Sequence, residues 1–196
     1  MSKYVYGIVC FFALPIFLCI KPLFAQNMNT FDTIDFGIQV VSNINREDFH
    51  DYWNPQKGIN LSAKTPFYFG DVQAGLQVSS FESLKRDVLG FNSFFIFAGW
   101  GVTIDFFHRW DWFNGFCVGN ELMDFGKSVS KYSRFESELA LSLNSQVAYH
   151  VNEKISVNVN ASHKIIYTYN KIRLSFVSLG INYSMDTPAW IQDFLE

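Results

Sequence analysis

The sequence predicts an all-β protein, an eight-stranded antiparallel up-and-down transmembrane β-barrel. Three observations support this fold class. Apolar and polar residues alternate through most of the chain, no segment after residue 25 is long and apolar enough for a membrane-spanning helix, and aromatic residues make up 18% of the chain. Lipid offers the backbone no hydrogen bonds, so strands cross a membrane only as a closed barrel.

The clearest alternation lies in two consecutive segments, 136–150 and 154–167, which the polar turn 151–153 separates. Successive side chains of a strand point to opposite faces, so the pattern predicts an antiparallel hairpin with one apolar and one strongly polar face. The apolar positions are Leu139, Leu141, Leu143, Val147, Tyr149, Ile155, Val157, Val159, Ala161 and Ile165.

Eight segments of this kind follow one another along the chain. Long connections follow the first, third and fifth, and short ones follow the second, fourth and sixth, which is typical of external loops and periplasmic turns in bacterial membrane barrels. The predicted strands cover 32–44, 57–66, 69–81, 91–106, 111–124, 135–150, 154–167 and 172–185.

Segment 91–106 has the most regular lipid-type face. Phe95 and Phe97 are exceptions that place large rings on the opposite face, where we expect the glycines to relieve crowding. The residues predicted to point outward are Phe94, Ile96, Ala98, Trp100, Val102, Ile104 and Phe106.

The chain divides into three regions. Residues 1–25 predict a secretory signal peptide, with Lys3 before an apolar stretch and Ala25 at the expected cleavage site. Residues 26–185 form the predicted barrel. The remainder, 186–196, predicts a short periplasmic amphipathic tail, since Trp190, Ile191 and Phe194 have helical spacing.

The end of the last predicted strand resembles the assembly signal of outer-membrane β-barrel proteins. That signal has a polar residue, a glycine and two apolar residues at fixed spacing, and the matching positions are Ser178, Gly180, Tyr183 and Met185. The chain that remains after the predicted signal peptide resembles, as a whole, the small OmpA/OmpX-like barrels. The junction 23–26 is similar to signal ends in Bacteroidetes-type bacteria.

This resemblance implies a location in the cell outer membrane. It implies outer-membrane lipid, lipopolysaccharide and the barrel-assembly machinery as partners, and a non-enzymatic structural, adhesive or surface-binding role. Cofactors are not expected.

The polar faces predict the contents of the barrel. The interior of an eight-stranded barrel is filled by side chains, so we expect a hydrogen-bonded, largely plugged lumen and no true pore. Charges inside it must pair or meet water. The predicted lumen network comprises Asp35, Asp71, Asp105, Glu136, Glu138, Asn144, Gln146, His150, Asn160 and Lys164.

Charge and cysteine content argue against other functions. Without residues 1–25 the chain has 13 basic and 18 acidic residues, a net charge of −5, which argues against a nucleic-acid partner. Cys117 is the one cysteine left, so the mature chain predicts no intramolecular disulfide and no cysteine-based metal site. We expect the polar segment 45–56, with Phe49 and Trp53, to be a surface loop with an aromatic anchor at the membrane interface.

Two alternatives remain open. A lipid-modifying enzyme of the lipid A deacylase type would need a serine, a histidine and an acid. Ser162 and His163 are neighbours on one strand and therefore point to opposite faces, and segment 172–185 contains no acid. A secreted lipocalin-like lipid binder would turn its apolar face inward around a ligand.

Overall fold

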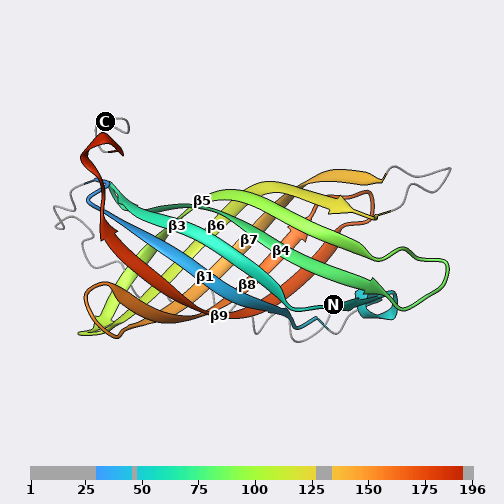
Figure 1. Ribbon diagram of the computed structural model, residues 1–196, viewed down its shortest axis with the longest axis horizontal. Coiled ribbons are helices and arrows are strands. Elements are labelled where there is room, and N and C mark those ends of the chain that lie inside the picture. Colours follow the sequence, from blue (N-terminus) through green and yellow to red (C-terminus); the bar gives the residue numbers. More distant parts are fainter. Residues whose placement is uncertain (1–29, 46–47, 127–133, 192–196) are drawn as a thin grey trace.

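The computed structural model describes residues 30–45, 48–126 and 134–191, and these residues form one closed antiparallel barrel (Figure 1). Eight long strands within this part of the chain pair with their neighbours in sequence order. The ring closes where the first long strand pairs with the last. The predicted fold class is confirmed. The strands are β1 (Thr33–Asn43), β3 (Gly58–Phe67), β4 (Gly70–Ser83), β5 (Phe91–Phe107), β6 (Trp110–Asp124), β7 (Phe135–His150), β8 (Ile155–Ile166) and β9 (Ile172–Asp186).

The two faces of the wall have the predicted polarity. On β6, apolar Val118 is 45% exposed on the outside, while the charged Glu121 is 0% exposed on the inside. The same alternation runs through β1, β8 and β9. An apolar exterior and a polar interior are the reverse of a lipocalin, so the lipocalin-like alternative is wrong.

The two ends of the barrel differ. The strand ends that border the longer connections 44–57, 84–90 and 125–134 lie at one end, which we call the loop end. The turns 68–69, 108–109 and 151–154 lie at the other, the turn end, together with the first residue of β1 and the last of β9. The part of the predicted tail that is described starts a helical turn at Ala189. Among the described residues, no helix has the length and apolar character to span a membrane. The predicted signal peptide lies outside the described residues.

Glycines make room for the inward rings. A Cβ added to Gly101 would lie 2.5 Å from the ring of Phe113, and one added to Gly75 would lie 2.6 Å from the ring of Phe97. The wall therefore has glycine where a ring from a nearby strand crosses it.

Segment 45–56 is not the interfacial anchor that its sequence predicts. It contains a short helical turn, η1 (Asp48–Asp51), and a three-residue strand, β2 (Trp53–Pro55), which pairs with β4. Phe49 stacks on Trp53 at 4.8 Å between ring centroids and meets Phe81, which points inward, at 5.3 Å. The rings of Phe49 and Trp53 are both partly buried and pack against the barrel's own core, so they lie over the loop end.

Candidate functional site

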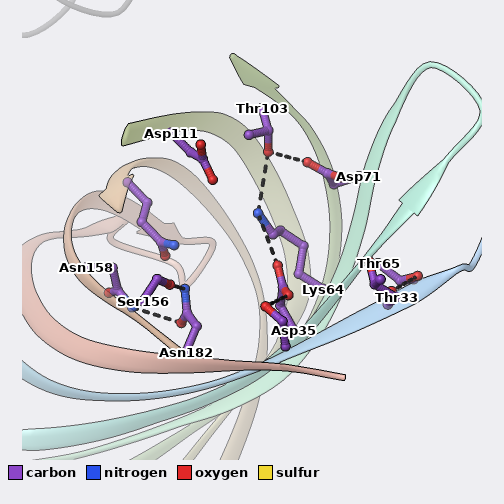
Figure 2. A network of polar contacts seen from close by, with 12 residues as sticks. Thr33, Asp35, Lys64, Thr65, Asp71, Thr103, Asp111, Ser156, Asn158 and Asn182 are labelled. Carbon is purple, nitrogen blue, oxygen red and sulfur yellow. Dashed lines mark hydrogen bonds and ion pairs between the residues drawn. The ribbon is translucent and has the colours of Figure 1, made fainter. Parts of the chain in front are cut away.

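Polar side chains from all eight long strands meet in the lumen, and its turn-end layer is built around Lys64. The Lys64 Nζ lies 3.4 Å from Thr103 Oγ1 and 3.9 Å from an Asp35 carboxylate oxygen (Figure 2). Thr103 donates in turn to Asp71, and Ser184 donates to Asp35. The Lys64 ammonium therefore contacts one carboxylate and a hydroxyl that bonds a second carboxylate, which compensates its partial removal from water.

A second group of acidic and basic side chains also lies at the turn end. His150 on β7 contacts the Asp111 carboxylate on β6, and Asp111 faces Asp105 across the β5–β6 pair. A cavity of about 10 Å³ separates this group from Asp35 and Lys64. That volume suits about one water molecule.

The middle layer consists mainly of amides, with Gln39 at its centre. The Gln39 amide nitrogen donates to Gln146 at 3.1 Å and to Asn158 at 2.7 Å. Its oxygen accepts from Asn60 and from Ser178, both at 3.1 Å. The adjoining cavity has a volume of about 40 Å³, enough for roughly two to four water molecules. This layer has no room for a small organic substrate.

The loop-end layer contains a buried ion pair in an aromatic shell. Lys164 is 1% exposed and Glu121 is 0% exposed, and the ammonium donates to both carboxylate oxygens at 3.0 and 2.8 Å. Ser93 also donates to Glu121. The rings of Phe95 and Phe176 lie 4.7 and 5.3 Å from the ammonium. Phe81, Phe91 and the rings of Phe49 and Trp53 cover this layer from the loop side.

The ten predicted lumen residues all lie on inward-facing positions, but they do not form one network. Four of them belong to the turn-end layer: Asp35, Asp71, Asp105 and His150. Three line the middle cavity: Asn144, Gln146 and Asn160. Lys164 belongs to the buried ion pair. Glu136 and Glu138 lie opposite Met123 and Glu121 near the loop end.

Several central residues lie outside the predicted network. Gln39, Glu121, Asn158 and Asn182 are buried and bonded, and the period-two rule that selected the others also places them inward. Their central role was invisible in the sequence because it depends on cross-strand contacts. The residues of the predicted assembly signal lie on β9, where Ser178 and Gly180 face inward and Tyr183 faces outward.

The outer wall holds a polar pair that sequence reasoning missed. Ser162 faces the middle cavity, whereas His163 faces outward, as strand geometry predicts. On the outside, His163 Nδ1 lies 2.9 Å from the hydroxyl of Ser175 on β9. Register alone brings these two residues together.

No group of three or more histidine, cysteine, aspartate or glutamate side chains among the described residues is arranged to hold a metal ion. The groups that are present can share protons and exchange hydrogen bonds with a few waters.

Comparison with known proteins shows a likeness of fold. No protein-family model matches the sequence, and no curated protein matches it. The Neisserial surface protein A structure has a TM-score of 0.53 at 12% identity, covering 79% of this chain and 96% of that one. The outer membrane protein Ail of Yersinia pestis, in a phospholipid bilayer nanodisc, has a TM-score of 0.51 at 16% identity, covering 79% and 99%.

The fold and the exterior lead to the same assignment. An apolar outer wall suits lipid, and the described chain closes its strands into a ring, as lipid requires. Both agree with the predicted location in the outer membrane. The chain has the fold of the small eight-stranded β-barrels of the outer membrane.

Proposed function

We propose that this barrel is a non-enzymatic, non-conducting outer-membrane protein whose role is structural, adhesive or surface-binding. The observation that supports this most is the filled lumen. Its cavities measure about 40 and 10 Å³, and layers of bonded side chains lie above, between and below them. A lumen of this kind can neither pass nor enclose a solute. We therefore assign the function of the barrel to its outer surface.

The loop end offers surface for such a role. Tyr52, Leu84 and Tyr169 are exposed there, and Tyr169, at 102%, projects fully from the short β8–β9 connection. Exposed aromatic residues on a rigid scaffold are suited to contact with a partner.

The test of a filled lumen is conductance. The purified full chain, inserted into planar lipid bilayers, is expected to give no large, stable conductance steps, because ions would have to pass the Lys164–Glu121 layer. Co-flotation with lipid vesicles confirms insertion, and a general porin serves as positive control. Long-lived steps that scale with the amount of inserted protein would contradict the proposal.

A second candidate is an enzyme that hydrolyses an ester of a membrane lipid. The observation in its favour is the His163–Ser175 contact of 2.9 Å on the outer wall, within the range of a nucleophile and its base. Against it, the outward positions of β7, β8 and β9 contain no aspartate or glutamate to orient the histidine.

Mass spectrometry of lipid A from cells that express the chain separates the two candidates. The structural proposal expects acylation to be unchanged. Deacylated lipid A that disappears in both Ser175→Ala and His163→Ala, but not in Ser162→Ala, would establish the enzyme instead. All three variants should still float with vesicles.

A further inference from the structure

Basic and aromatic side chains gather on one part of the outer wall, where β8 and β9 reach the loop end. We call this set the rim patch, and it comprises His163, Tyr167, Lys171, Arg173 and Ser175. Tyr167, Lys171 and Arg173 are exposed, and His163 and Ser175 lie on the outward face just below them.

The backbone beneath the rim patch is firmly held. The Asn45 side chain donates to the Arg173 carbonyl at 2.6 Å and accepts from the Ser175 amide. The Ile44 amide donates to the Ser175 carbonyl at 2.9 Å. Two of the patch residues are therefore fixed at the backbone while their side chains face outward, which lowers the entropy cost of binding a ligand.

The apolar residues on the turn-end side of the rim patch indicate its position relative to the membrane. On β9, Val177, Leu179 and Ile181 are exposed on the same face, and the outward residues of β8 below His163 are also apolar. Toward the loop end, hydroxyl, imidazole and cationic groups join the apolar residues of this face, among which Ile165 lies between His163 and Tyr167. Such a mixture is typical of the change from hydrocarbon to head groups. The connection from Tyr167 to Lys171 is short, so its charges stay at that level.

Among residues 30–45, 48–126 and 134–191, no carboxylate pairs with the two strong cations of the patch, Lys171 and Arg173. The Lys171 ammonium lies over the Tyr167 ring at 5.4 Å. The outward positions of β7, β8 and β9 contain no acid. The opposite end of β8 differs, since Glu153 accompanies Lys154 in the turn between β7 and β8.

We propose that the rim patch binds a phosphate group of a phosphorylated glycolipid in the outer leaflet. Lys171 and Arg173 supply positive charge and several N–H donors, a combination that suits phosphate oxygens. Ser175 and Tyr167 add hydroxyl groups for the sugar, and the apolar band below accepts the acyl chains. The proposal rests on the proposed location in the outer membrane and adds a specific lipid site to it.

The test compares two double variants of the full chain with equal loss of charge. Lys171→Gln/Arg173→Gln removes the charges of the patch, and Arg109→Gln/Lys154→Gln removes two exposed charges at the turn end. Native mass spectrometry from detergent micelles measures the binding of lipid A, with dephosphorylated lipid A and phosphatidylglycerol as comparison lipids. Heat-dependent gel migration checks that each variant is folded.

Wild type and the turn-end variant are expected to bind lipid A alike, and the patch variant roughly thirtyfold more weakly, the effect of removing two charges near a membrane surface. Equal binding of dephosphorylated lipid A would overturn the phosphate assignment, and equal binding of phosphatidylglycerol would overturn the glycolipid. An equal loss in both variants would also overturn the site. Failure of the wild type to insert into any lipid would instead contradict the membrane barrel itself.

Discussion

The least expected single interaction is the ion pair between Lys164 and Glu121, which is almost completely withdrawn from solvent. Taking two charges out of water costs several kcal/mol each, and close contact with good hydrogen bonds offsets that cost. The ammonium meets both carboxylate oxygens, and Ser93 satisfies one of them as well. Removal of either side chain would therefore leave the other charge buried without a partner, which would destabilise the barrel.

Lys164→Met is expected to lower the free energy of unfolding by about 3–5 kcal/mol, because it leaves the Glu121 carboxylate buried without its partner. Lys164→Met/Glu121→Gln should lose less, since the amide is neutral and still accepts from Ser93. Urea unfolding in lipid vesicles measures both. Lys154→Met, at an exposed site, is the control and should stay within about 0.5 kcal/mol of wild type. A double variant as unstable as the single one would disprove the role of charge burial.

At the scale of the element, β5 shows how one strand serves two environments. Its outward residues Ile96 and Ala98 are exposed, and Phe95 and Phe97 on the other face belong to the core. The period of two assigns each side chain to a face without any knowledge of the rest of the fold. What the period cannot tell is which glycine of a neighbouring strand makes room for an inward ring.

Ala98→Arg on β5 is expected to destabilise the barrel in lipid by about 2–4 kcal/mol, because the guanidinium would lie near the middle of the apolar band. Phe107→Arg, at the exposed turn end of the same strand, should cost only about 0–1 kcal/mol. Equilibrium unfolding in vesicles gives both values. Equal effects at the two sites would mean that β5 is not embedded as described.

Segment 45–56 illustrates the limit of local patterns. Its charged and aromatic composition predicts a surface loop, and Asp51, Tyr52 and Asn54 are exposed. Phe49 and Trp53, however, pack against inward-facing rings, and the Trp53 indole donates to the Leu89 carbonyl at 2.8 Å. Because apolar contacts are non-directional, rings on a connecting segment pack wherever a complementary apolar surface is near.

At the scale of the whole molecule, three stacked layers of side chains fill the barrel from one mouth to the other. Cys117 lies in the wall of the middle cavity and is 1% exposed, with amide donors from Gln73 and Asn144 each 3.0 Å from its sulfur. It therefore reports whether reagents reach the lumen from either end.

The folded protein is expected to leave Cys117 unmodified by a water-soluble maleimide over hours, and urea should expose it to rapid labelling. Tyr169→Cys in the Cys117→Ser background is the control and should react at once, since position 169 is fully exposed. Mass spectrometry of the intact chain counts the added labels. Rapid labelling of Cys117 in the folded barrel would disprove the filled lumen.

The sequence by itself determined the eight long strands, the face to which each of their side chains points and the closed antiparallel class of fold. These properties are local, since period two follows from the backbone and closure follows from the demand of lipid for paired amides. Only the tertiary structure decided the partners. Lys164 with Glu121, Gln39 with Asn158, and His163 with Ser175 each join different strands. Such pairs depend on register and on the stagger of the closed barrel, which period two leaves undetermined.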